Sequence, residues 1–193
     1  MKKRNFLAAA ALGPAALPSL VQAAGDGAKG SPALLTVTGA ITKTNRGPLD
    51  SVRDIMMARQ KIAFDKAHAF EFGMLTAMPA VTIKPTIEYD KKPHTLRGPL
   101  LADVLKACGV TGDAGKLAMR AVDGYSPTLS IADARKYRFI VATHLDGKPM
   151  PLGGLGPLWA VYDADRFPDM AAKTLDQRFA QCPWALYHIE VQA

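Results

Sequence analysis

The stretch His94-Thr95-Leu96-Arg97-Gly98-Pro99-Leu100-Leu101, which continues through Asp103-Val104-Leu105 to Gly109, contains a change from one kind of structure to another. Residues 95–98 have the short extended pattern of a strand that follows the polar loop 89–94. Residues 99–109 have apolar positions at helical spacing, with proline in the first turn and glycine at the end. The stretch therefore predicts a strand that leads directly into a helix.

Outward from this stretch, strands predominate on both sides. Segments of alternating or β-branched residues predict strands over residues 34–39, 69–72, 81–84, 95–98, 116–122, 139–145, 159–162 and 186–191. Apolar periodicity predicts helices over residues 49–64, with Asp50 as N-cap, and over residues 73–79 and 99–109. Because the strands outnumber the helices and do not alternate with them regularly, the sequence predicts an α+β fold with a mixed or antiparallel sheet.

The first 33 residues have a different composition from the rest. Lys2, Lys3 and Arg4 precede an apolar run and a small-residue end at 21–23, an order typical of a secretory signal peptide over residues 1–23. Residues 24–33 predict a flexible leader, and residues 34–193 predict one domain, so we expect an exported, periplasmic protein. Sec export is favoured, but residues 3–7 also resemble a twin-arginine signal with lysine in the first place, and both routes stay open.

Composition and motifs argue against several classes of function. The formal net charge of +7 includes the three N-terminal positive charges, and no basic stretch is interleaved with aromatic residues, so we expect no nucleic-acid partner. There is no zinc motif, phosphate loop or nucleophile elbow. The four histidines lack the spacing of a metal site. Two cysteines, Cys108 and Cys182, do not make a disulfide framework, and Cys108 is expected to be buried at a helix end.

Four stretches, taken with their order and spacing, resemble the small members of the oxidoreductase molybdopterin-binding family. They are residues 35–39, 94–105, 123–126 and 146–162, and the closing Pro183-Trp184 with residues 189–191 is similar to the family's end. The resemblance extends over residues 34–191. It implies the sulfite oxidase fold, a compact α+β domain with a mixed β-sheet core and a few helices, whose pterin cofactor lies in a cleft between strand ends and loops.

The resemblance departs from the family at its metal ligand. In catalytic members a cysteine on a strand-end loop supplies a thiolate to molybdenum, a soft ligand suited to that metal. The corresponding stretch here is Val81-Thr82-Ile83-Lys84-Pro85-Thr86, and neither Cys108 nor Cys182 stands at that place. We therefore predict no metal ligand and no catalytic residue. A pterin is the expected cofactor, and molybdopterin is less favoured.

The residues predicted to contact the pterin are Thr86, Glu88, Tyr89, Tyr125, Ser126, Gly156, Trp159 and Trp184. The aromatic residues offer ring faces for stacking, and Glu88 offers a carboxylate to the guanidine-like edge of a pterin. The glycines around Gly156 offer backbone N–H groups to an anion. The alternatives stay open: core packing for Trp159 and Trp184, a strand-turn corner for Tyr125, and a solvated acidic turn for Glu88.

The resemblance implies a periplasmic pterin-binding protein that does no metal chemistry. Small relatives of this kind act as ligand sensors with the periplasmic domain of a membrane signalling protein in cyclic-di-GMP control. The alternative is a molybdenum cofactor-dependent oxidoreductase with an unusual ligand set, which the twin-arginine pattern would suit because a cofactor loaded in the cytoplasm requires export of a folded protein. A third reading is a fold kept only as an interaction surface.

Overall fold

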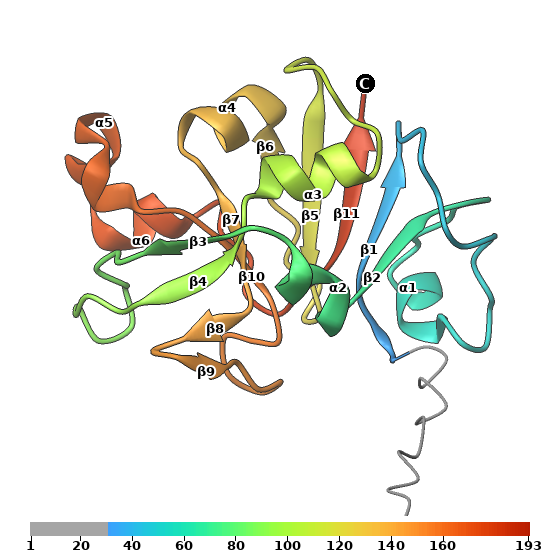
Figure 1. Ribbon diagram of the computed structural model, residues 1–193, viewed down its shortest axis with the longest axis horizontal. Coiled ribbons are helices and arrows are strands. Elements are labelled where there is room, and N and C mark those ends of the chain that lie inside the picture. Colours follow the sequence, from blue (N-terminus) through green and yellow to red (C-terminus); the bar gives the residue numbers. More distant parts are fainter. Residues whose placement is uncertain (1–30) are drawn as a thin grey trace, which may run out of the picture.

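The computed structural model describes residues 31–193 (Figure 1). The predicted signal peptide, residues 1–23, and residues 24–30 of the predicted leader lie outside the described residues. The elements are β1 Ala33–Gly39, α1 Ile55–Arg59, β2 His68–Glu71, α2 Phe72–Ala77, β3 Ala80–Ile83, β4 Leu96–Pro99, α3 Leu101–Ala107, β5 Lys116–Ala121, β6 Thr128–Ser130, α4 Ile131–Lys136, β7 Ile140–Ala142, β8 His144–Leu145, β9 Lys148–Pro149, β10 Trp159–Val161, η1 Ala164–Arg166, α5 Pro168–Ala171, α6 Leu175–Phe179 and β11 Leu186–Gln192. Within this range no helix is both long and apolar enough to span a bilayer.

A five-stranded sheet with the order β2-β1-β11-β5-β6 joins the two ends of the described chain. β1 and β11 run parallel, with Val37 opposite Ile189, and the other neighbours in this sheet are antiparallel. Figure 1 shows β1 and β11 side by side, with α3 in front of the sheet. Both faces of β1 are covered, because Thr36 and Thr38 are buried together with Leu35 and Val37. The mixed sheet of the predicted α+β fold is confirmed.

The remaining strands form a four-stranded sheet, β3-β4-β8-β9, and a two-stranded pair, β10-β7. The stretch 94–109 connects these layers. A side chain at Gly98 would overlap the backbone carbonyl of Val141 in β7, so only glycine allows β4 to approach β7 this closely. Next to it, the Leu101 N–H donates to the Phe139 carbonyl at 2.8 Å. The chain therefore crosses from sheet to helix with its backbone paired throughout.

The predicted helix over residues 49–64 is wrong in extent. Only α1 is helical, because the Asp50 carboxylate accepts the N–H groups of Val52 and Arg53 in a preceding turn, at 2.8 Å each, and Lys61 has a left-handed φ of 59° that ends the segment. Val52 is 79% exposed, and Ile55 and Met56 are exposed as well. The apolar spacing was helical, but nothing among the described residues covers this face.

The helix predicted over residues 99–109 begins later than expected. Pro99 is the last residue of β4, where it pairs with Ala80, and α3 starts at Leu101. The predicted strand at 139–145 is two strands, β7 and β8, separated at Thr143, whose N–H donates to the Arg97 carbonyl. The sequence analysis did not predict the short elements β6, β9, η1, α5 and α6. Ala33, placed in the leader, already belongs to β1.

Candidate functional site

Four of the predicted contact residues, Glu88, Tyr89, Tyr125 and Trp184, lie together around Cys182, and we call these four residues the ring cluster. The Tyr89 ring is 54% exposed. Burial of its hydroxyl, followed by the neighbouring Glu88 carboxylate, raises the pKa of Tyr89 well above its usual value, while the Trp184 indole acts in the opposite direction. The loop 84–95 thus brings a carboxylate and a phenol against the segment that follows α6.

Tyr125 reaches the same segment from the turn between β5 and β6. Its backbone N–H donates to the Asp123 carboxylate at 2.9 Å, which forms the turn, and its hydroxyl donates to the Ala180 carbonyl at 2.5 Å. The side chain is nevertheless 48% exposed. Burial, then the neighbouring Cys182 and Glu88, raise the pKa of the Tyr125 hydroxyl. A ring held at its hydroxyl end with an exposed face is suited to stacking against a flat ligand.

Cys182 lies beneath the ring cluster, a position that the sequence analysis did not foresee. The residue is buried, and burial, followed by the Glu88 charge, raises the pKa of its thiol well above the ordinary value. The backbone N–H of Tyr162 interacts with the Cys182 thiol. The Cys182 carbonyl accepts the Trp159 indole N–H at 3.0 Å. A soft metal would have to displace the thiol proton and the residues that cover Cys182 before the sulfur could act as a ligand. The adjacent Pro183-Trp184 motif was the signal that could have placed it here.

The residues present do not fit the molybdenum site that the resemblance implies. Thr86, in the stretch where that site would have its cysteine, donates its backbone N–H to the Asp165 carboxylate at 2.8 Å. Among residues 31–193, no three side chains of His, Cys, Asp or Glu are grouped so that they could hold a metal ion. Cys108 is a free, fully buried thiol at the end of α3, as predicted for a small apolar residue.

The other predicted contact residues lie outside the exposed cluster. Trp159 is 1% exposed and packs its ring against Phe179, so it is a core residue and offers no free face to a ligand. Its backbone pairs with Trp184, which makes it the support beneath the ring cluster. A side chain at Gly156 would overlap the Met150 carbonyl, so this glycine is required by packing and its backbone is buried. Ser126 is partly exposed beside Tyr125.

A network around His94 holds the loop that carries Glu88 and Tyr89. His94 Nδ1 lies 2.7 Å from the Asp146 carboxylate and Nε2 lies 3.0 Å from the Asp90 carboxylate, while the Thr95 N–H donates to Asp146 at 2.9 Å. These contacts, Asp146 first, raise the pKa of His94. The interaction with His94 in turn lowers the pKa values of Asp90 and Asp146. The loop is thereby fastened to the β8–β9 hairpin.

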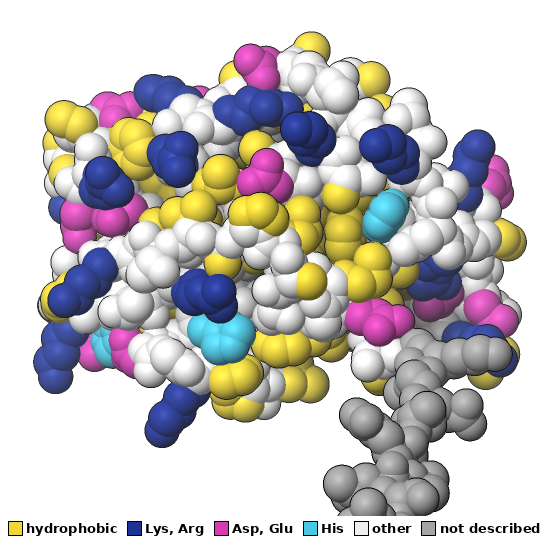
Figure 2. Space-filling model, in the orientation of Figure 1, with side chains coloured by type: hydrophobic (Ala, Val, Ile, Leu, Met, Phe, Trp, Pro, Cys, Tyr) yellow, Lys and Arg dark blue, Asp and Glu magenta, His cyan; other side chains and the backbone are white. Residues whose placement is uncertain are grey.

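Charged side chains on the visible face are mixed in sign. Figure 2 shows Lys and Arg scattered over this face, with Asp and Glu between them. No basic stripe of the kind that follows a nucleic-acid backbone is seen on it.

Comparison with known proteins identifies a fold. No family model matches the chain, and no curated protein matches it. Among the solved structures that match is the sulfane dehydrogenase SoxCD from Paracoccus pantotrophus, with a TM-score of 0.56 and 12% sequence identity. The match covers 82% of this chain and 37% of the SoxCD chain, so this chain spans little more than a third of the SoxCD chain's length.

This likeness bears on the fold alone. It shows that the chain shares an α+β fold with part of that sulfane dehydrogenase, which is the coarser part of the sequence-based expectation. The finer assignment to the sulfite oxidase fold stays a prediction, as do the ligand contacts of the ring cluster.

Proposed function

We propose that this protein binds a flat heteroaromatic ligand of the pterin class at the ring cluster and performs no metal-centred chemistry there. The observation that carries the proposal is the convergence of two exposed phenol rings, Tyr89 and Tyr125, with the Glu88 carboxylate and the Trp184 indole. The rings would stack on the ligand, and the carboxylate would accept paired N–H groups from its guanidine-like edge. No other grouping of predicted contact residues forms within residues 31–193.

The direct test is calorimetric titration of the full chain with tetrahydrobiopterin under anaerobic conditions. Saturable binding is expected, and Glu88→Gln should weaken it about tenfold, because a hydrogen bond to a charged group is worth about 1.5–3 kcal/mol. Tyr89→Phe should keep most of the affinity and Tyr89→Ala should not. Glu190→Gln, which removes an exposed carboxylate on β11, is the matched control. Absence of heat and of any thermal shift with reduced and oxidised pterins would exclude this function.

We further propose that occupancy of the ring cluster is reported, in the periplasm, to the periplasmic domain of a membrane signalling protein in cyclic-di-GMP control. A ligand shifts such an equilibrium only if its affinity differs between the free and partner-bound states. The loop around Tyr89 and the exposed segment 152–154, in which Leu152 is 70% exposed, would therefore contact both ligand and partner. Tetrahydrobiopterin should change the affinity of this chain for the purified periplasmic domain of a candidate cyclic-di-GMP membrane protein from the same organism, and Glu88→Gln should abolish that change.

One observation favours the alternative, a molybdenum cofactor-dependent oxidoreductase. The Cys182 thiol lies beside Glu88 beneath the ring cluster. A cysteine sulfur is the type of ligand that a soft metal prefers. To act so, the thiol would have to be uncovered and lose its proton. Metal analysis of protein purified from its own periplasm separates the two functions: stoichiometric molybdenum that disappears in Cys182→Ser would establish the enzyme.

A further inference from the structure

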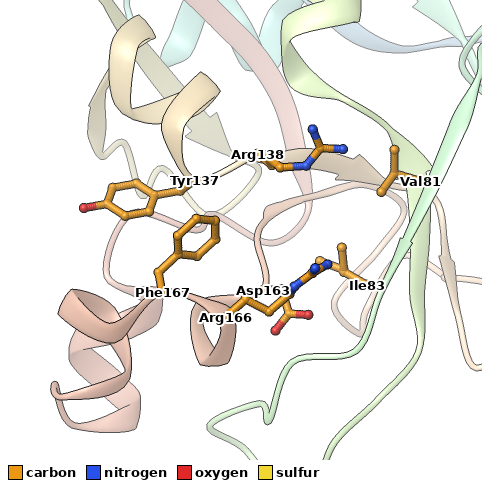
Figure 3. A pocket seen from close by; sticks show the side chains of 7 residues that line it. All are labelled: Val81, Ile83, Tyr137, Arg138, Asp163, Arg166 and Phe167. Carbon is orange, nitrogen blue, oxygen red and sulfur yellow. The ribbon is translucent and has the colours of Figure 1, made fainter.

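A concave slot lies between β3, the end of α4 and the η1 turn, apart from the ring cluster (Figure 3). Its volume is about 240 Å³. We call it the arginine slot, and its lining residues are Val81, Ile83, Tyr137, Arg138, Asp163, Arg166 and Phe167. None of them was among the predicted contact residues.

The slot holds two arginines and one acidic residue, so positive charge is in excess. Arg138 and Arg166 enter it from opposite sides, and Figure 3 shows both guanidinium groups extending towards the β3 side chains. Within residues 31–193, neither guanidinium belongs to an ion pair, whereas Arg46, Arg135 and Arg178 are each paired with a carboxylate. Two free guanidinium groups facing one cavity are suited to a carboxylate or phosphate, which they can bind through parallel N–H groups.

Asp163 is the acidic residue in the lining. Burial raises the pKa of its carboxyl group, while the Lys84 backbone N–H, which it accepts at 3.4 Å, and the charge of Arg166 lower that pKa. Two arginines therefore face one carboxyl group, which leaves one positive charge for an anionic ligand.

The walls of the slot are apolar and well fixed. Val81 and Ile83 project from the same face of β3, on the opposite side from the exposed Thr82. The rings of Tyr137 and Phe167 meet edge to face, with centroids 5.2 Å apart, and the Tyr137 hydroxyl is engaged outside the slot by Asp169 at 2.6 Å. The slot therefore offers a ligand an apolar surface as well as two cations.

The backbone of Arg138 gives a second, independent observation. The Arg138 N–H donates to the Arg135 carbonyl and the Phe139 N–H donates to the Ala134 carbonyl, at 3.1 and 3.0 Å, which is the hydrogen-bond pattern that ends a helix at a left-handed residue. Arg138 occupies that position with a φ of 54°, where glycine is the favoured residue. A long cationic side chain held in a strained backbone position is typical of a functional site.

We propose that the arginine slot binds a small organic anion, with its oxyanion group between Arg138 and Arg166 and its apolar body against Val81, Ile83 and Phe167. The site is separate from the ring cluster and does not depend on pterin binding. Its ligand class is an aromatic or aliphatic phosphate or carboxylate that fits within the slot volume.

Phenyl phosphate is the probe for this site, titrated into the full chain by calorimetry, with benzoate and inorganic phosphate as comparison ligands. Phenyl phosphate should bind more tightly than inorganic phosphate, because only the former fills the apolar wall. Arg166→Gln should weaken phenyl phosphate binding about tenfold. The matched control is Arg97→Gln, since Arg97 is exposed and pairs with Thr82 on the opposite face of β3 and β4.

Arg138→Gly separates binding from folding. This variant should retain or raise the thermal midpoint, because glycine suits the left-handed position, and should still lose phenyl phosphate affinity about tenfold. Binding that is absent at millimolar phenyl phosphate, or that Arg97→Gln weakens as much as Arg166→Gln does, overturns the proposal. Loss of phenyl phosphate binding in Glu88→Gln would equally overturn a separate site, whereas loss of pterin binding alone in that variant concerns only the ring cluster.

Discussion

The ring cluster and the arginine slot hold their polar groups in opposite ways. In the ring cluster, the Tyr125 hydroxyl donates to a backbone carbonyl. Glu88 raises the pKa of Tyr89, and Trp184 lowers it. In the slot, Arg138 and Arg166 have no ion-pair partner within residues 31–193. The ring cluster therefore offers aromatic faces and one carboxylate to a ligand, whereas the slot offers an excess of positive charge to a ligand of the opposite sign.

The two regions are linked through a short stretch of chain. Asp163 lines the slot, while Asp165, two residues on, accepts the Thr86 N–H and pairs with Arg178 at 2.8 Å. Thr86 begins the loop that carries Glu88 and Tyr89. The comparison can therefore be sharpened by changes that damage one region, both regions or the link between them.

The largest effect is expected from Trp159→Ala. The ring is fully buried, so its removal should lower the free energy of unfolding by about 3–5 kcal/mol, measured by urea denaturation. Trp159→Phe, which loses the hydrogen bond to the Cys182 carbonyl but keeps a ring, should cost about 1–3 kcal/mol. Both variants should weaken tetrahydrobiopterin binding more than phenyl phosphate binding, because Trp159 supports the ring cluster. Equal weakening at both sites would show that the regions are not separable.

Acid should remove stability that both regions share. His188 is buried in β11 beside Thr38, with Nε2 at 2.9 Å from the threonine hydroxyl, and burial lowers its pKa from 6.5 to about 4. The unfolded chain therefore binds a proton more readily, and stability present above pH 6.5 is lost as the pH falls towards 4, by up to about 3 kcal/mol.

Urea denaturation between pH 4 and 8 measures this loss, because this range includes both the unfolded-state pKa of His188, 6.5, and its folded-state pKa of about 4. His188→Gln should flatten the pH dependence even if it lowers the overall stability. If the five-stranded sheet unfolds with the rest of the chain, both ligands should lose their binding together at low pH. An unchanged pH dependence in His188→Gln would mean that another group is responsible.

Arg138→Gly should have a smaller effect on stability and of the opposite sign. Relief of the left-handed strain at residue 138 should raise the free energy of unfolding by about 1 kcal/mol, since an L-residue in that conformation costs about 1–2 kcal/mol. Glycine's greater freedom in the unfolded chain offsets part of this gain. The ring cluster has no comparable position, so no single substitution there should both stabilise the fold and abolish binding. A destabilised Arg138→Gly would show that the arginine side chain contributes to packing.

The difference between the regions also explains what the sequence could predict. β5 was predictable because its alternating residues match its alternating burial, whereas β1 and β11 were predictable from their strand-forming residues, although both are buried at consecutive positions. Tyr125 and Trp184 lie in stretches that resemble the molybdopterin-binding family, and Glu88 and Tyr89 lie in the loop before one of them. The structure brings the four residues together, and their contacts with a ligand stay predictions. The arginine slot combines β3, the end of α4 and η1, so its residues share no local pattern in the sequence.

The error at residues 49–64 has the same origin. Helical spacing of Val52, Ile55 and Met56 predicted a buried face, but spacing alone does not determine which surface covers a side chain. Trp159 shows the converse, since a matched motif predicted a ligand contact and the residue is buried in the core. Local sequence therefore predicted the elements better than it predicted their surroundings.

The smallest effect is expected at His94, which fastens the ring-cluster loop and not the slot. Because contacts with Asp146 and Asp90 raise the His94 pKa above 6.5, the stabilising contribution is complete below that pH and is lost as the pH rises through the folded-state pKa. His94→Gln should lower the thermal midpoint slightly at pH 6, and the variant and the natural protein should converge as the pH rises beyond that transition. Tetrahydrobiopterin affinity should weaken over the same pH range while phenyl phosphate affinity follows only its own ionisation. If His94→Gln weakens phenyl phosphate affinity equally, the loop 84–95 couples the two regions. The two sites would then differ in their chemistry but would not bind independently.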